Sequence, residues 1–127
     1  MTGYPYQYVV LRLVPRVERQ EFVNVGVVLY SQEAEFIDGA FHLDPDRARA
    51  VDPGVDLEAV RSALETVCRV ARGEAGPPGR MAPGRRFGWL AAPRSTIVQP
   101  GPVHGGVSTD PRATLEHLMR RLVMVGA

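Results

Sequence analysis

The sequence predicts an α+β domain in which two main helices pack on a largely antiparallel sheet of three or four strands. The first third of the chain contains three segments of strand character joined by short links, which favours an antiparallel meander. Farther along, apolar residues recur at helical spacing over residues 56–72 and 111–123. The length of 127 residues fits a single domain, residues 1–127, with one core.

Four segments have the character of strands. Residues 6–13 direct Val9, Leu11 and Leu13 to one face, and residues 35–43 alternate in the same way. Residues 21–30 are apolar on both faces, which is typical of a central strand. Alternation assigns their side chains to two faces: Val23, Val25, Val27 and Leu29 on one, and Phe22, Asn24, Gly26, Val28 and Tyr30 on the other. Residues 95–99, STIVQ, are expected to form a short fourth strand.

The two main helices have recognisable starts. Asp56 is expected to cap the first helix, and Asp110 with Pro111 behind it is expected to begin the second. Their apolar stripes should face the core: Leu57, Val60, Leu64, Val67, Cys68 and Ala71 in the first helix, and Leu115, Leu118, Met119 and Leu122 in the second. Between strands and helices we expect turns at Asp44-Pro45 and at residues 52–54, a Pro/Gly loop at 73–84 and a short helical turn within 84–92.

Charge is unevenly distributed along the chain. All 15 basic residues are Arg, a bias that a GC-rich genome explains, and the net charge is only +1. Residues 31–65 hold nine acids and three Arg, a charge of −6, whereas residues 66–109 hold six Arg and one acid, a charge of +5. This asymmetry predicts either an anion- or nucleic-acid-binding surface or two segments that face each other in the fold.

The sequence also restricts the cellular setting. No stretch approaches the roughly 18 apolar residues of a membrane span, and the first residues lack the basic start and apolar core of a signal peptide. We therefore expect a cytoplasmic protein with no membrane association. The single cysteine excludes an internal disulfide.

Three groups of residues are compatible with catalysis or metal binding, but each has a simpler interpretation. Cys68 lies in an apolar helical stripe, where a cysteine is usually a buried hydrophobe. His42, Asp44 and Asp46 have metal-compatible atoms, yet they flank a proline turn and no further ligand group lies nearby in sequence. His104 precedes two glycines, without the G-x-S-x-G elbow of a lipase-like site. We predict no catalytic residue, no metal site and no cofactor.

A set of polar residues is more suggestive of binding. The predicted ligand-binding residues are Arg12, Glu21, Asn24, Arg86, Arg94, Ser95 and Gln99. A pocket of arginines with an amide and a hydroxyl suits a phosphate or carboxylate, which guanidinium groups can hold with two hydrogen bonds. The alternative is an internal pair, in which Arg12 or Arg86 bonds Glu21 and pins a long loop to the sheet. We expect Arg12, Glu21, Asn24 and Arg86 to form one spatial cluster.

Three long stretches carry a family resemblance: YQYVVLRLVPRVERQEFVNVGVVLY, RRFGWLAAPRSTIVQPGPVHGG and DPRATLEHLMRRLV. Together they resemble the bacterial domain-of-unknown-function family 3037 over almost the whole chain. The matching elements are Arg12, Pro15, Glu21, Asn24 and Gly26 in the first half, and Arg86, Phe87, Leu90, Ser95, Gln99 and Gly105 in the second. Because this family has no established activity, the resemblance implies a fold and a motif set. It also implies a protein partner, a kinase of the HipA-like kind.

Taken together, these features favour a small non-catalytic binding or accessory protein. A first alternative is binding of nucleic acid or of a phosphate ligand through an arginine-rich surface formed by Arg80, Arg85, Arg86 and Arg94. The near-neutral total charge and the scarcity of neighbouring aromatic residues weaken the nucleic-acid version. A second alternative, a small hydrolase or nuclease-like enzyme, is disfavoured because no acid–base pair stands out.

Overall fold

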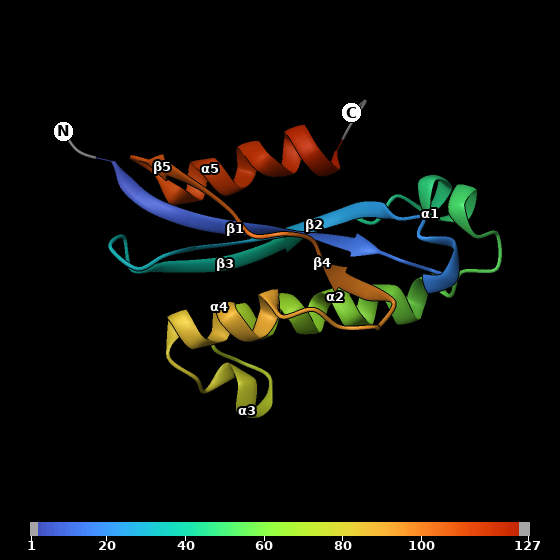
Figure 1. Ribbon diagram of the computed structural model, residues 1–127, viewed down its shortest axis with the longest axis horizontal. Coiled ribbons are helices and arrows are strands. Elements are labelled where there is room, and N and C mark those ends of the chain that lie inside the picture. The colour runs from blue at the N-terminus through green and yellow to red at the C-terminus, as the bar shows by residue number, and fades with distance from the viewer. Residues whose placement is uncertain (1–2, 125–127) are drawn as a thin grey trace.

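The computed structural model describes residues 3–124, and its centre is an antiparallel sheet (Figure 1). The strands are β1 (Tyr4–Leu13), β2 (Val23–Ser31), β3 (Phe36–Phe41), β4 (Val98–Pro100) and β5 (His104–Ser108). Their order is β3-β2-β1-β4, and β5 pairs with the other end of β1. The predicted α+β class is confirmed, and the first three strands form the expected meander.

The strand β5 was not expected, because its sequence HGGVS has no apolar alternation. Its pairing with β1 explains one of the two glycines, Gly106. A Cβ atom on Gly106 would lie 2.5 Å from the hydroxyl oxygen of Tyr6, so only glycine leaves room for the tyrosine side chain that crosses it. This strand exists because of a long-range partner, and the sheet therefore has five strands where three or four were predicted.

A β-bulge in β2 overturns the simple alternation predicted for that strand. Leu11 of β1 pairs with Gly26 and Arg12 pairs with Asn24, so Val25 is an extra residue without a partner on β1. The extra residue shifts the phase of the strand. Residues before and after the bulge therefore share faces differently: Val23, Val25 and Val28 join one core cluster, whereas Val27 and Leu29 join the other.

Aspartate caps begin three of the helices. Asp56 accepts a hydrogen bond from Ala59 N (3.1 Å) at the start of α2 (Leu57–Ala71), and Asp110 accepts one from Ala113 N (3.2 Å) at the start of α5 (Pro111–Leu118), as predicted. Asp44, expected in a turn, instead caps the short helix α1 (Pro45–Val51). The remaining helical elements are a 3₁₀ turn (Val17–Arg19), α3 (Gly76–Gly79), α4 (Pro83–Ala91) and a π-helical extension of α5 (Met119–Val123).

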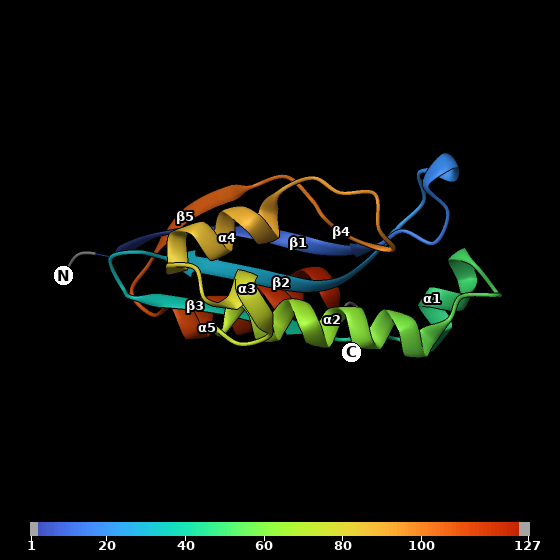
Figure 2. The ribbon, with the colours of Figure 1, turned by 90° about the horizontal axis from the view of Figure 1, so that it is seen from below.

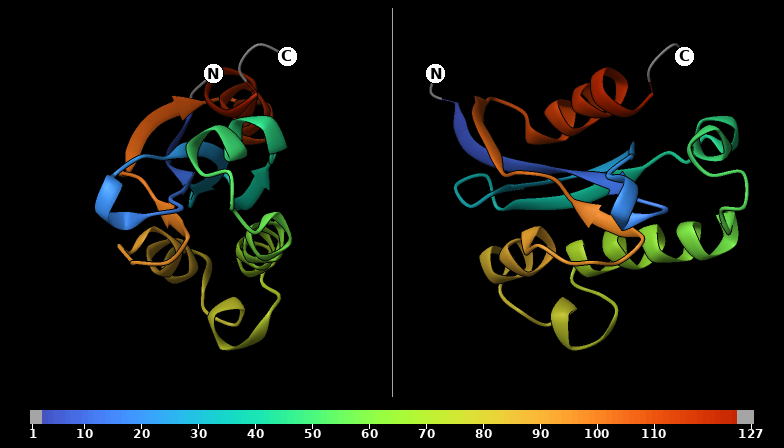
Figure 3. Two further views of the ribbon diagram at one scale, coloured as in Figure 1. Left: turned by 90° about the vertical axis from the view of Figure 1, so that its right-hand side faces the viewer. Right: turned by 45° about the vertical axis from the view of Figure 1, so that its right-hand side comes forward.

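The helices form a layer on each side of the sheet (Figures 1 and 3). One face, here the α2/α4 face, is covered by α2 and α4, and the opposite α5 face is covered by α5 with its extension. The core on the α2/α4 face contains 15 buried residues, and the core on the α5 face contains five. None of the helices in residues 3–124 has the length and apolar character needed to cross a bilayer.

The inward side of the C-terminal helix differs from the predicted stripe. Leu115, Met119 and Val123 are buried, whereas Leu118 and Leu122 are only partly buried at its flanks. The π-helical turn over Met119–Val123 widens the helix at this point, and the buried residues recur every four positions.

The edge strand β3 is held by two ion pairs of Asp38, one with Arg72 of the basic segment and one with Arg112, which follows that segment. Asp38, buried in β3, accepts from Arg72 Nε (3.0 Å) at the end of α2 and lies 2.8 Å from Arg112 Nη1 of α5. A single carboxylate thus joins helices on both faces of the sheet around its edge. The pair of Asp38 with Arg72 supports the expectation that the acidic and basic segments partly face each other.

Candidate functional site

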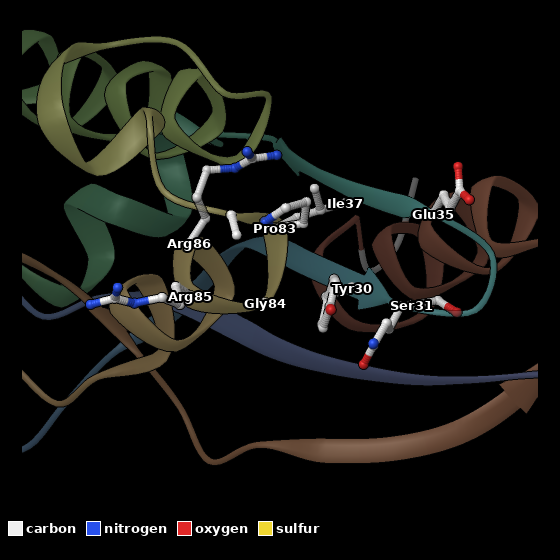
Figure 4. A pocket seen from close by; sticks show the side chains of 10 residues that line it. Tyr30, Ser31, Glu35, Ile37, Pro83, Gly84, Arg85 and Arg86 are labelled. Carbon is white, nitrogen blue, oxygen red and sulfur yellow. The ribbon is translucent and has the colours of Figure 1, made fainter.

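A cleft of about 790 Å³ opens between the β2–β3 hairpin and the start of α4 (Figure 4). Its wall combines apolar and polar groups: Tyr30, Ser31, Gln32, Glu35, Ile37, Ala82, Pro83, Gly84, Arg85 and Arg86. The volume lies in the range of small-molecule sites in proteins. This cleft is the best candidate site in the described part of the chain.

The hairpin side of the cleft is held in place by Ser31. Its hydroxyl donates a hydrogen bond to Pro5 O (2.8 Å) and accepts one from Ala34 N (3.3 Å), which ties the hairpin turn to the start of β1. Within that turn, Glu35 has a left-handed backbone with φ of 51°. The carboxylate of Glu35 lies on the hairpin rim, well apart from the two arginines of α4 (Figure 4).

The floor of the cleft is aromatic. The ring of Tyr30 stacks on Phe87 of α4 at 5.7 Å between centroids, which fixes the tyrosine against the helix. Gly84 permits this approach, because a Cβ there would lie 3.1 Å from the Tyr30 hydroxyl oxygen. The tyrosine therefore presents a planar, partly exposed surface beside the first turn of α4.

The helical side of the cleft is electropositive. The N-cap residue Ala82 offers no side-chain acceptor, and the first turn of α4 contains no acid to offset the helix dipole. Arg85 is exposed and points away from Tyr30 (Figure 4). Arg86 is half-buried: its Nη1 donates to Met81 O at 2.9 Å, and its Nε is buried without a hydrogen-bond partner among residues 3–124.

Three of the predicted binding residues lie in one row across the sheet. Arg12 pairs with Asn24 of β2 on one side and with Gln99 of β4 on the other, so all three point toward the α5 face. Asn24 Nδ2 donates to Leu122 O (3.2 Å), and Gln99 Nε2 donates to Thr96 O (2.9 Å). The amide of Asn24 therefore ties the sheet to the C-terminal helix.

Arg12 itself is stacked and not ion-paired. Its guanidinium lies 4.2 Å from the ring centroid of Phe22, and its Nε is buried without a partner among the described residues. Glu21, the expected partner of Arg12 or Arg86, instead pairs with Arg19 at 2.7 Å on the surface. The internal arginine–glutamate pair suggested by the sequence is therefore not formed.

The other predicted residues lie elsewhere. Arg94 stacks over Trp89 at 4.6 Å and donates to the carbonyl oxygens of Trp89 and Ala92, and burial lowers the pKa of its guanidinium. Ser95 is exposed in the loop that follows. Because α4 packs on the α2/α4 face, Arg86 is separated by the sheet from the Arg12 row, and the four residues expected to cluster do not share one site.

A family model for proteins of unknown function, DUF3037, matches residues 8–123, nearly the whole chain. The chain belongs to this family. The expected family is thus confirmed. No curated protein and no solved structure shows significant similarity to the chain.

The interpretation of Cys68 as a buried hydrophobe agrees with its surroundings, whereas Asp44, expected in a turn, begins a helix. Cys68 is 2% exposed, and burial raises the pKa of its thiol to about 11, so little thiolate forms at neutral pH. Asp44 uses its side chain to cap α1. Within residues 3–124, no three His, Cys, Asp or Glu side chains come together with the geometry of metal ligands.

Sequence reasoning singled out two arginines that line the cleft, Arg85 and Arg86, and missed the other lining residues. Tyr30, Ile37 and Pro83 have no chemical signature in sequence, because apolar and aromatic residues are usually core. A usable signal was present in the segment APGRRFGW, where a proline-initiated helix without an acid in its first turn carries two arginines.

Proposed function

We propose that this protein is a non-catalytic binding protein, an accessory module that holds an anionic ligand with a planar or apolar body in the cleft beside α4. The proposal rests on the environment of the Arg86 guanidinium. Its Nε is buried and lacks a hydrogen-bond partner among the described residues, and none of the ion pairs found there includes it. Arg86 lines the cleft and its charge has no carboxylate partner, so a bound carboxylate or phosphate would supply the missing counter-charge.

The rest of the cleft supports this ligand chemistry. Tyr30, Ile37 and Pro83 provide planar and apolar surface, and the uncapped start of α4 favours a negative group. At the hairpin rim, Glu33 and Glu35 are exposed carboxylates, which would repel a long polyanion. A ligand with one anionic group therefore suits the cleft better than nucleic acid.

The lining residues also favour binding over catalysis. The hydroxyl of Ser31 is occupied by Pro5 O and Ala34 N, so it is not poised as a nucleophile. Glu35 is the only carboxylate among the lining residues, and neither histidine nor cysteine lines the cleft. An acid–base pair of the kind that hydrolysis requires is therefore absent from this wall.

Phenyl phosphate is a suitable probe, because it joins a planar apolar ring to one phosphate. We expect it to shift the backbone amide resonances of Gly84 and Arg85 in a ¹⁵N-edited NMR titration. Arg86→Gln should weaken binding about 10- to 100-fold, the range that corresponds to one or two charge-assisted hydrogen bonds. Arg61→Gln, an exposed arginine on α2, is the matched control and should leave binding unchanged.

Two further measurements make the titration decisive. Phenol and inorganic phosphate, titrated separately, divide the contributions of the ring and the anion. Because Arg86 also donates to Met81 O, the melting temperature of Arg86→Gln must be measured to separate lost binding from lost folding. Unshifted Gly84 and Arg85 resonances, or equal binding by a folded Arg86→Gln variant, would contradict the proposal.

The accessory role extends to a protein partner, for which the kinase of the HipA-like kind remains a prediction. Affinity purification from native cells with mass spectrometry tests it, and a reproducible single partner is the expected result. Release of phenol from phenyl phosphate during the titration would instead favour the hydrolase alternative.

A further inference from the structure

The strand β5 forms a bare edge of the sheet. It pairs with β1 along one side, from Tyr4–Ser108 to Tyr8–His104, and within residues 3–124 no strand pairs with its other side. Alternate backbone N–H and C=O groups of an edge strand point outward and are free to pair with another chain. Figure 2 shows β5 along one border of the sheet, with β3 and α2 toward the opposite border.

The opposite edge, β3, is protected in a way that β5 is not. Asp38 of β3 forms ion pairs with Arg72 and Arg112, and α2 and α5 both pack against this strand. Charged side chains and covering helices are the usual means by which proteins block edge pairing. The sequence of β5, HGGVS, contains no acid, no arginine and no proline.

Exposed apolar side chains flank the bare edge on both faces of the sheet, because Tyr4 pairs with Ser108 and therefore points away from the face of Val107. Val107 of β5 is 70% exposed, Val103 just before the strand is 47% exposed, and Tyr4 on the paired end of β1 is 37% exposed. A run of uncharged backbone flanked by such residues is typical of a contact surface. A second copy of this chain could approach it without repulsion between like charges.

We propose that β5 pairs antiparallel with β5 of a second copy, centred on Gly106. In this register Val107 lies opposite Gly105 of the partner subunit, and His104 lies opposite Ser108 of the partner subunit, twice by symmetry. Gly105 and Val107 point to the same face of the strand. A Cβ on Gly105 would contact only Tyr6 O, at 3.4 Å, so this position leaves space for the opposing valine side chain.

The pairing makes one continuous sheet across two copies. Paired residues on antiparallel strands point to the same face, so the two α2/α4 faces lie on the same side of the dimer. Both copies of α4, with the cleft beside each, then lie on that side.

Sedimentation velocity over a range of protein concentration tests the dimer. Because the contact is small, we expect weak association that is detected only toward the highest protein concentrations. Val107→Lys places a charge opposite Gly105 of the partner subunit and should keep the protein monomeric at the highest concentration. Val17→Lys is the matched control: Val17 is 52% exposed in the 3₁₀ turn, and its substitution should leave association unchanged.

Disulfide trapping tests the register. Gly105→Cys and Val107→Cys variants, mixed and oxidised, should form a mixed disulfide dimer, whereas Gly105→Cys mixed with Val103→Cys should form little. The native Cys68 is buried and does not interfere. A wild-type protein that stays monomeric, a Val107→Lys variant that still dimerises, or no enrichment of the 105–107 disulfide over the control would each overturn the proposal.

Discussion

The two faces of the sheet are covered by helical layers that are held in place by different interactions. On the α2/α4 face, 15 buried residues form one apolar cluster beneath two helices. On the α5 face, a single helix and its π-helical extension bury five, and polar bonds supplement them. These bonds are Asn24 Nδ2 to Leu122 O (3.2 Å), Arg47 Nη1 to Val123 O (2.9 Å), Ser108 Oγ with Thr114 Oγ1 (2.5 Å) and Arg112 Nη1 to Asp38 Oδ2 (2.8 Å).

The difference shows how a thin layer can be positioned without a large core. Apolar burial is nondirectional and grows with area, so the heavier layer needs few specific tethers. A single helix over two strands gains less from burial, and hydrogen bonds to fixed partners set its position. The α5 face should therefore be the more sensitive to loss of a polar contact, and the α2/α4 face to loss of apolar volume.

Leucine truncation should have the largest effect and should differ between the faces. Leu64→Ala in α2 and Leu115→Ala in α5 each remove a buried side chain and should cost about 2 to 5 kcal/mol of unfolding free energy. We expect Leu64 toward the upper end because it belongs to the larger buried cluster. Urea denaturation measures both. Arg61→Ala, on the exposed side of α2, should cost about 0.5 kcal/mol or less. A larger loss for Leu115 than for Leu64 would contradict the conclusion that apolar burial contributes more on the α2/α4 face.

Asp38→Ala should have an intermediate effect, because this residue serves both layers. The substitution removes two charge-assisted hydrogen bonds from a buried carboxylate, and the half-exposed Arg72 and Arg112 can then reach water. We expect a loss of about 1.5 to 3 kcal/mol in urea denaturation. Glu18→Ala, in an exposed pair with Arg16, is the control, and a loss as small as its own would mean that the β3 edge does not depend on the ion pairs.

Asn24→Ala should cause the smallest loss of stability of the three. The loss should be confined to the layer formed by α5 and its extension. It leaves Leu122 O without its donor, for a cost of about 1 to 2 kcal/mol. Hydrogen exchange should quicken at amides of α5 and its extension while those of α2 stay protected. Gln99→Ala is the control, because the amide of Gln99 donates to the nearby Thr96 O. Uniform loss of protection across both helices in Asn24→Ala would contradict a local tether.

Much of the fold was readable in the sequence because its signals are local. Apolar alternation indicated β1 and β3, and a run apolar on both faces indicated the central strand β2. The helix starts at Asp56 and Asp110 followed from side-chain caps that act within one turn. The family resemblance likewise rested on linear motifs. Each of these signals depends on residues within a few positions of one another, so one chain suffices to see them.

Only the tertiary structure decided what these elements bring together. The bulge at Val25 set which side chains of β2 share a face, and it depends on the register with β1. β5 became a strand because β1 lies beside it, although its glycines carry no pattern of their own. Arg86 could be singled out from the sequence, but its separation from Arg12, and its place in one cleft with Tyr30, follow from the face on which α4 packs. Periodicity and capping are local properties of the chain, whereas register, packing side and convergence at a cleft arise from long-range contacts.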